Sequence, residues 1–239
     1  MGKTMTYVIS DIHGEYKKLR TLLNILEDDA IEYIFLGDYL DKGENPKATI
    51  NLLLNLSCRK KCIFLAGDHE YAWMEYIKGD ESFLKFILNY GGIKTLESYS
   101  NRQLTVKEAN NILSNKTVLK KLLKNHLPFY SGLKFYHTID SRFLCVHAGI
   151  NPENKSLKLD EHNKKEIVFI RDKFINSGFL YKGRRIIFGH TAFKEPYLDK
   201  YKIGIDTGAV YAEMGTLTAF NIEKELFIKH TGKKWSLSK

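Results

Sequence analysis

Cysteine is scarce in this chain, which has only Cys58, Cys62 and Cys145. Three cysteines cannot all pair with one another, so they do not indicate a disulfide framework. Cys58 and Cys62 lie close together in the sequence, but no second cysteine pair or nearby histidine completes a zinc pattern. We therefore expect three reduced thiols in a cytoplasmic protein.

Long apolar runs and basic runs are also missing. No run approaches the roughly 20 residues that a membrane span needs, so we expect no membrane association. The chain enters the strand-like segment Tyr7-Val8-Ile9 with no charged and then apolar leader, which argues against a signal peptide. The net charge is +9, and the excess lies after residue 70, because residues 1–70 carry 9 basic and 11 acidic side chains. This excess would steer anionic substrates, but no lysine run is long enough to indicate nucleic-acid binding.

Apolar residues are plentiful, at 44% hydrophobic with 13% aromatic, which is ample for a substantial core. In the first third of the chain, apolar segments at 6–10, 33–36 and 61–65 predict strands. Between them, apolar residues at helical spacing predict helices at about 16–26 and from Pro46 to Leu54. This alternation of strand and helix indicates an α/β layered sheet.

The pattern changes from residue 71 to about residue 126, where strand signals vanish and apolar residues recur at helical spacing. Gly91-Gly92 interrupts one predicted helix, and Thr105 with Glu108 fits a capping box at the start of another. No linker rich in proline or serine isolates this segment. We therefore interpret it as a helical insert that lies over one end of the sheet, within a single domain spanning residues 1–239.

Strand signals return after Pro128. The last four predicted strands have little helix between them, which suggests a more antiparallel second sheet. The predicted fold class is therefore α/β, with two mixed β-sheets packed face to face and flanked by helices. The six strands predicted after Pro128 lie at 133–139, 142–146, 185–188, 203–205, 216–220 and 226–229.

Five of the predicted strands share one feature, since each ends in an ionisable or metal-binding residue. In α/β sheets, ligands collect outside the carboxyl ends of the strands. Mixed carboxylate and imidazole ligands suit manganese, iron or zinc. Six ligands with one shared are enough for two ions roughly 3.5–4 Å apart, as in hydrolytic two-metal sites. The candidate metal ligands are Asp11, His13, Asp38, Asp68, His147 and His190.

These stretches resemble the signature blocks of the phosphoprotein phosphatase family, which belongs to the calcineurin-like metallophosphoesterases. The similarity extends over nearly the whole chain and is closest to small serine/threonine phosphatases of bacterial or phage type. Segments 127–130, 169–172 and 205–209 also resemble small bacterial members. The blocks are Asp11-Ile12-His13-Gly14, Gly37-Asp38-Tyr39-Leu40-Asp41-Lys42-Gly43, Gly67-Asp68-His69-Glu70, His147-Ala148-Gly149 and Gly189-His190-Thr191.

The resemblance implies a role for each residue in these blocks. His69 would be the catalytic acid and Asp41 its partner. One metal ion would be held by Asp11, His13 and Asp38. The other would be held by Asp38, Asp68, His147 and His190. We expect two divalent ions, with manganese as the first candidate and iron or zinc as alternatives.

The chemistry of these residue types agrees with a phosphatase. Two dications would lower the pKa of a bridging water, so that hydroxide is available at neutral pH to attack phosphorus. His69, hydrogen-bonded to Asp41, would pass a proton to the leaving oxygen. Arg171 is the candidate phosphate clamp, because its guanidinium fork matches two phosphate oxygens. The alternative for Arg171 is a surface ion pair with Asp172 or Glu166.

Three positions depart from the family pattern. Asp68 stands where the family has a metal-binding asparagine, Lys42 where it has an arginine, and Ala66 where protein phosphatases often have another arginine. With Asp68, three carboxylates and a hydroxide cancel two dications, whereas an asparagine would leave a positive site. Lys42 keeps a charge for the phosphate but loses bidentate geometry. We therefore expect tight metal binding, which could extend to a trivalent ion, and a weaker grip on phosphate.

Three functions are compatible with the sequence. The leading hypothesis is a metal-dependent phosphatase acting on phosphomonoesters, including phosphoserine or phosphothreonine in proteins. Close behind stands hydrolysis of dinucleoside polyphosphates such as diadenosine tetraphosphate, because small bacterial relatives use the same blocks for pyrophosphate bonds. The third is a weakened or inactive relative that binds metal and a phosphorylated partner. The expected partner is thus a phosphorylated protein or a small phosphoester or nucleotide substrate.

Overall fold

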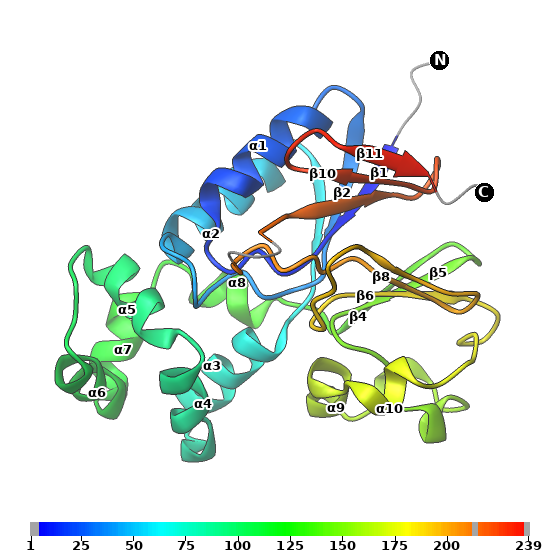
Figure 1. The fold of residues 1–239 in the computed structure, drawn as a ribbon. Helices are drawn as coiled ribbons and strands as arrows, with labels where there is room; N and C mark the ends of the chain where they lie inside the picture. The colour runs from blue at the N-terminus through cyan, green and yellow to red at the C-terminus, as the bar shows by residue number, and fades with distance from the viewer. Residues whose placement is uncertain (1–4, 212–214, 237–239) are drawn as a thin grey trace.

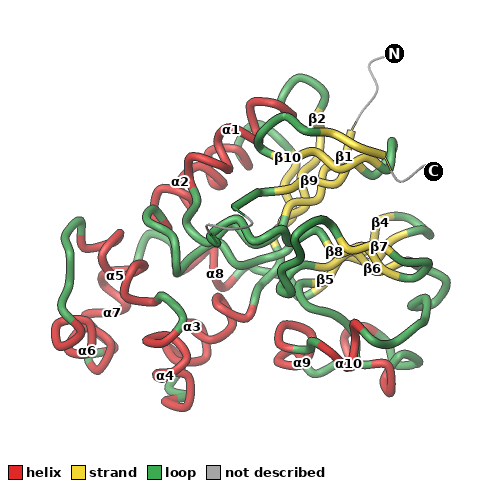
Figure 2. The backbone as a smooth tube through the Cα atoms, in the orientation of Figure 1, coloured by secondary structure: helices red, strands yellow, loops and turns green. Residues whose placement is uncertain are grey.

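The chain forms two β-sheets that pack face to face, with helices on the outer face of each (Figures 1 and 2). The computed structural model describes residues 5–211 and 215–236, so the predicted domain limits at 1 and 239 lie outside the described residues. The strands are β1 (Met5–Ile9), β2 (Ala30–Phe35), β3 (Lys61–Phe64), β4 (Tyr136–Ile139), β5 (Phe143–Val146), β6 (Arg185–Phe188), β7 (Tyr197–Leu198), β8 (Lys202–Gly204), β9 (Thr218–Asn221), β10 (Leu226–Lys229) and β11 (Lys234–Ser236).

The first sheet has the strand order β11-β10-β9-β1-β2-β3, and the second has the order β4-β5-β6-β8-β7. Both sheets mix parallel and antiparallel neighbours, and helices flank them, so the predicted fold class is confirmed. The α-helices are α1 (Tyr16–Leu26), α2 (Pro46–Ser57), α3 (Asp68–Lys78), α4 (Leu84–Asn89), α5 (Gly92–Ser100), α6 (Val106–Ser114), α7 (Lys116–Leu123), α8 (Leu127–Ser131), α9 (Lys164–Phe169) and α10 (Asp172–Ile175).

Strand β1 shows how the layers are held together, because its successive side chains point to opposite faces of the first sheet. Tyr7 and Ile9 pack on one face with Leu19 of α1. Val8 points the other way, into the core between the two sheets, where it joins Phe143 of β5. A third core lies between the second sheet and helices α9 and α10. The order of layers is therefore helix, sheet, sheet, helix.

The prediction that the last four strands belong to a more antiparallel second sheet is wrong for β9 and β10. β6 and β8 lie in the second sheet, but they are parallel to one another. β9 returns to the first sheet and pairs antiparallel with β1, with Phe220 opposite Val8, and β10 pairs with β9. All four residues of β9 are buried, which suits a strand with a neighbour on each side. The spacing along the chain marks these strands but carries no information about their partners.

Helices α3 to α8 fill the chain between β3 and β4 and lie beside one end of the sheets (lower left in Figure 1). Gly91 precedes α5 with φ +95°, and Thr105 begins α6 with a capping box, so both predicted helix boundaries are confirmed. Among the described residues, no helix is both long and apolar enough to cross a membrane.

The parallel strands of the two sheets determine where functional residues can meet. β1, β2 and β3 run parallel in the first sheet, and β5, β6 and β8 run parallel in the second. The residues that follow these strands contact one another across the two sheets, as His147 does with Asp68. The carboxyl ends of both parallel groups therefore meet at one edge of the sandwich.

Candidate active site

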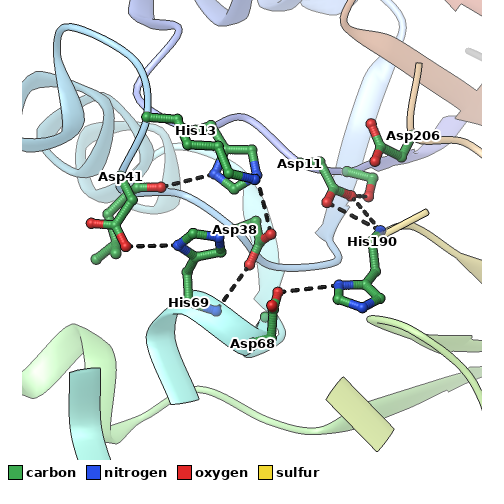
Figure 3. A network of polar contacts seen from close by, with 12 residues as sticks. Asp11, His13, Asp38, Asp41, Asp68, His69, His190 and Asp206 are labelled. Carbon is green, nitrogen blue, oxygen red and sulfur yellow. Dashed lines mark hydrogen bonds and ion pairs between the residues drawn. The ribbon is translucent and has the colours of Figure 1, made fainter. Parts of the chain in front are cut away.

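Six parallel strands each end beside a polar side chain of one buried cluster, part of which is shown in Figure 3. The cluster contains residues from the five stretches of the sequence that were predicted to meet. It also contains one residue from a sixth stretch, which follows β8. The side chains are Asp11, Asp38, Asp68, His147, His190 and Asp206, which follow β1, β2, β3, β5, β6 and β8 respectively.

Glycines precede Asp38 and Asp68 because the ends of β2 and β3 approach closely. A Cβ atom on Gly67 would overlap the carboxylate of Asp38, and one on Gly37 would overlap the backbone of Gly67. Gly37 also has φ +118°, a backbone conformation that side chains strongly disfavour. A larger residue at either position would displace Asp38.

The backbone of the site is strained at six non-glycine positions. The φ angles are +46° at Asp11, +45° at His13, +55° at Asp38, +66° at Asp41, +59° at Lys42 and +64° at His190. Non-glycine residues adopt positive φ in only about a few per cent of cases. Strain of about 1–3 kcal/mol per residue is characteristic of functional sites, where the surrounding structure enforces it. The sharp turns aim these side chains back over the strand ends.

One half of the cluster is formed by Asp38, Asp68, His147 and His190, whose ligand atoms all lie within 4.8 Å of one another. Asp68 Oδ1 is 3.2 Å from both His147 Nε2 and His190 Nδ1. His147 Nδ1 lies 2.9 Å from the carbonyl oxygen of Leu36, to which it donates, so the other ring nitrogen, Nε2, faces the carboxylates. His190 Nε2 is buried without a hydrogen-bond partner.

A second group of possible ligand atoms within 4.8 Å of one another comes from His13, Asp38 and His69, while Asp11 lies beside His190 (Figure 3). His13 Nε2 is 3.2 Å from Asp38 Oδ2, and His13 Nδ1 is 2.9 Å from the carbonyl oxygen of Leu40. The carboxylate of Asp11 accepts the backbone N–H of His190 at 3.0 and 3.1 Å, and it also accepts the hydroxyl of Ser10. Asp11 therefore lies beside the other predicted ligands with much of its hydrogen-bonding capacity already used.

These donors fit divalent metal ions. The two oxygens of Asp38 point to opposite halves of the cluster, Oδ2 toward His13 and Oδ1 toward His147. Burial would lower the pKa of His147, but Asp38, Asp68 and Asp11 raise it to about 10. Burial would also raise the pKa of Asp38, but the three nearby imidazoles hold it well below its usual value. Such a negative pocket, lined by carboxylate and imidazole donors, favours bound cations.

His69 and Asp41 form a buried pair on the flank of this cluster, with His69 Nδ1 2.7 Å from Asp41 Oδ2. His69 is the second residue of α3, directly after Asp68, and its backbone N–H donates to Asp38 Oδ1. Burial would lower the pKa of His69, but Asp38 and Asp41 raise it to about 9. The neighbouring carboxylates therefore favour the protonated form of His69.

Two basic side chains, Arg171 and Lys42, line a pocket of about 250 Å³ together with the cluster. Arg171 Nη1 donates to the carbonyl oxygen of His190 at 3.0 Å. Among residues 5–211 and 215–236, no ion pair joins Arg171 to Asp172 or Glu166, the surface alternative considered above. Lys42 Nζ lies 2.9 Å from Nε2 of His13, a candidate metal ligand.

Two residues of this site were not identified from the sequence. The carboxylate of Glu70, fully buried, accepts the backbone N–H groups of Gly67, Asp38 and Tyr39 at 2.8–3.0 Å, so it holds the ends of β2 and β3 together. Asp206 lines the pocket beside Asp11, as Figure 3 shows, and accepts the N–H of Gly208. Glu70 lies three residues after Gly67 in the block Gly67-Asp68-His69-Glu70. This spacing is the one local signal in the sequence that could have identified Glu70 as a residue of the site.

Comparisons with known proteins agree with this arrangement. Bis(5'-nucleosyl)-tetraphosphatase PrpE [asymmetrical] from Oceanobacillus iheyensis is 26% identical over 92% of this chain and 90% of that protein. Serine/threonine-protein phosphatase PP1-1 from Saccharomyces cerevisiae is 28% identical over 65% of this chain but only 42% of its own length. A crystal structure of a putative diadenosine tetraphosphatase has a TM-score of 0.61 at 18% identity, covering 95% of this chain and 93% of that one.

The fold and the buried aspartate–histidine cluster define a metal-dependent hydrolase of phosphoesters. The chain belongs to the calcineurin-like phosphoesterase family, whose model matches residues 5–205. The matched region includes every predicted metal ligand, together with His69, Asp41, Lys42 and Arg171. The resemblance to this family that the signature blocks indicated is therefore confirmed.

Proposed function

We propose that this protein is a phosphatase that hydrolyses phosphomonoesters, including phosphoserine and phosphothreonine in proteins. The observation that supports this most directly is the placement of the His69–Asp41 pair beside Asp38, at the rim of the metal-binding cluster. A proton donor next to a cation site is the combination that cleavage of a phosphate ester requires.

The cluster offers two cation positions that share Asp38. Asp11, His13 and Asp38 would hold the first ion, and Asp38, Asp68, His147 and His190 would hold the second. When bound, two divalent ions lower the pKa of a water between them and neutralise charge on the phosphoryl oxygens. Manganese is the first candidate because the donor set mixes carboxylate and imidazole, and iron and zinc bind similar sets.

The remaining steps belong to the side chains around the cluster. The guanidinium of Arg171 and the ammonium of Lys42 would hold phosphate oxygens in the pocket. His69 would give its Nε2 proton to the leaving oxygen, and the buried carboxylate of Asp41 would hold the opposite nitrogen, Nδ1. The hydrogen bond to Asp41 favours the protonated form of His69.

A second candidate function is the hydrolysis of dinucleoside polyphosphates. Four aromatic residues, Phe86, Tyr90, Phe169 and Tyr211, line the same pocket as the metal-binding cluster. Tyr90 and Tyr211 are about half exposed, so their rings are available to a bound group. Aromatic faces stack on nucleobases with little selectivity. The similarity to PrpE over most of both chains supports this candidate as well.

One assay distinguishes these functions. The protein is purified with manganese and tested side by side on p-nitrophenyl phosphate, a phosphopeptide and diadenosine tetraphosphate. Turnover of the phosphopeptide with little turnover of the nucleotide supports the protein phosphatase. Preference for diadenosine tetraphosphate supports the second candidate. No turnover of any of the three contradicts both and leaves a metal-binding relative without activity.

Replacing the carboxylate of Asp68 tests whether this residue favours metal binding at the expense of phosphate binding. Burial and Asp38 would raise the pKa of Asp68, but hydrogen bonds from His147 and His190 hold it below its usual value, so the residue is charged. Asp68→Asn should lower the KM for a phosphomonoester about 10–150-fold, because an amide can donate to phosphate where a carboxylate repels it, a difference of about 1.5–3 kcal/mol. The measurement is steady-state kinetics at saturating manganese, with metal content verified. A KM that is unchanged or higher would contradict the prediction.

Arg171 provides a test of the phosphate clamp. Arg171→Lys should raise the KM about 10–150-fold and change kcat much less, because a lysine keeps the charge but loses a bidentate contact worth about 1.5–3 kcal/mol. The matched control is Arg142→Lys, since Arg142 pairs with Asp140 at an exposed position. Equal KM values for the two variants would show that Arg171 is a surface residue without a role in binding.

A further inference from the structure

The surroundings of Asp41 contain more hydrogen-bond donors than its partnership with His69 requires. Asp41 is fully buried, and its carboxylate is contacted by three side chains. Besides His69, Trp73 Nε1 lies 3.0 Å from both carboxylate oxygens, and Thr95 Oγ1 lies 2.5 Å from Oδ1. Trp73 comes from α3 and Thr95 from α5, within the segment predicted as a helical insert.

Thr95 holds Asp41 at two points. The backbone N–H of Asp41 donates to Thr95 Oγ1 at 2.9 Å. A backbone N–H can only donate, so the threonine oxygen accepts there and its own hydrogen is free to go to the carboxylate. One hydroxyl therefore fixes both the backbone of Asp41, which has φ +66°, and the rotation of its side chain.

The indole of Trp73 restricts the same carboxylate from another side. An indole N–H is a donor only, as is the hydrogen that Thr95 directs at Oδ1. With two donors already aimed at it, the carboxylate presents Oδ2 to His69 as an acceptor. His69 therefore donates its Nδ1 hydrogen to Asp41, and the opposite nitrogen of the ring, Nε2, is directed away from Asp41.

Helix α5 is docked on the turn that carries Asp41. The backbone N–H of Lys42 faces the carbonyl oxygen of Gly91 at 3.4 Å, and a Cβ atom on Gly91 would overlap the backbone of Lys42. Thr95 lies one helical turn after Gly91. In α4, the ring of Phe86 contacts the ring of His69 edge-on, with centroids 5.1 Å apart. These helices therefore touch both members of the Asp41–His69 pair.

We infer that Thr95 and Trp73 are positioning residues for the proton donor, a statement that rests on the proposed role of His69. They fix the carboxylate of Asp41 so that His69 presents Nε2 to the leaving oxygen. Without the Thr95 hydroxyl, Asp41 loses one donor to its carboxylate and the acceptor for its N–H, and both groups are fully buried. Loss of an outer hydrogen-bond partner that orients a functional group typically costs about 10–100-fold in activity.

The first test compares two esters that differ in their need for a proton. Phenyl phosphate releases a basic phenolate and depends strongly on the donor, whereas 4-nitrophenyl phosphate releases a more acidic phenol and depends on it less. Thr95→Val should lower kcat about 10–100-fold for phenyl phosphate and much less for the nitrophenyl ester. Thr95→Ser, which keeps the hydroxyl, should restore most of the loss. Equal losses on both esters, or no loss on either, would overturn the inference.

The matched control is Thr49→Val in α2. Thr49 is also fully buried, and its hydroxyl has no hydrogen-bond partner among the described residues. The substitution is the same and removes no such contact, so it should leave both esters unaffected. A loss in Thr49→Val like that in Thr95→Val would show that the effect comes from altered packing.

The second test requires no turnover. The chain has two tryptophans, so a ¹H–¹⁵N spectrum contains two indole resonances, and Trp235→Phe assigns them. Thr95→Val should shift the Trp73 indole resonance and speed its hydrogen exchange, because the shared carboxylate is freer to move. An unmoved resonance in an active enzyme overturns the inference and leaves the proposed function intact. If the wild-type protein hydrolyses neither ester, the proposed function fails, and the inference fails with it.

Discussion

Asp38→Asn is expected to reduce kcat/KM by at least about 1,000-fold, because loss of an outer partner alone costs about 10–100-fold and this residue is the proposed shared ligand. The two oxygens of Asp38 face different halves of the cluster, at 3.2 Å from His13 and 3.6 Å from His147. An amide has one oxygen and no charge, so it cannot serve both halves. Both cation positions should weaken together.

The measurement for Asp38→Asn combines steady-state kinetics with a manganese titration by calorimetry and metal analysis of the purified protein. The control is Asp28→Asn, which removes the same charge at an exposed position before β2. A variant that keeps two manganese ions per chain at wild-type affinity would contradict the proposed sharing. A variant that loses only one ion would place Asp38 in a single cation position.

The strand ends could be predicted from the sequence because their signal is local. An apolar run followed at once by glycine and aspartate, as at Leu36-Gly37-Asp38, contains both the strand and the residue that its end presents. Repetition of this form at several places, combined with the rule that strand ends gather ligands, was enough to bring Asp38, Asp68 and His147 together. The structure places these side chains in one buried cluster.

The supporting residues could not be predicted, because their partners are distant in the sequence. Thr95 contacts a residue 54 positions away, and nothing in the amphipathic pattern of its helix distinguishes this hydroxyl from any other. Asp206 lies in segment 205–209, which resembles small bacterial members of the family, but that resemblance assigned no role to its carboxylate. The pairing of β9 within the first sheet could not be predicted for the same reason, because strand pairing depends on contacts that form only in the completed core.

Lys42, which stands where the family has an arginine, makes a contact in the structure that the sequence did not indicate. The sequence suggested only that a lysine holds phosphate less well than an arginine. The structure places the ammonium 2.9 Å from His13 Nε2, the nitrogen that faces Asp38 because Nδ1 is engaged with the carbonyl of Leu40. Lys42 therefore contacts the candidate metal ligand His13 and also lines the pocket. Both contacts depend on the turn at Asp41 and Lys42.

His69→Asn is expected to lower kcat about 100–10,000-fold for phenyl phosphate, the range typical of a lost general acid, and substantially less for 4-nitrophenyl phosphate. Asparagine can still bond to Asp41 but has no proton to give at neutral pH. The measurement is kcat for both esters with metal content determined in parallel, and His137→Asn in β4 is the control.

A ligand atom of His69 also lies within 4.8 Å of ligand atoms of His13 and Asp38, so the alternative role for His69 is to bind a cation. Equal losses on both esters together with lost metal would establish that role and contradict the proton donor. Retained metal with a loss that grows as the leaving group becomes more basic would support the donor, because only proton transfer depends on the leaving oxygen.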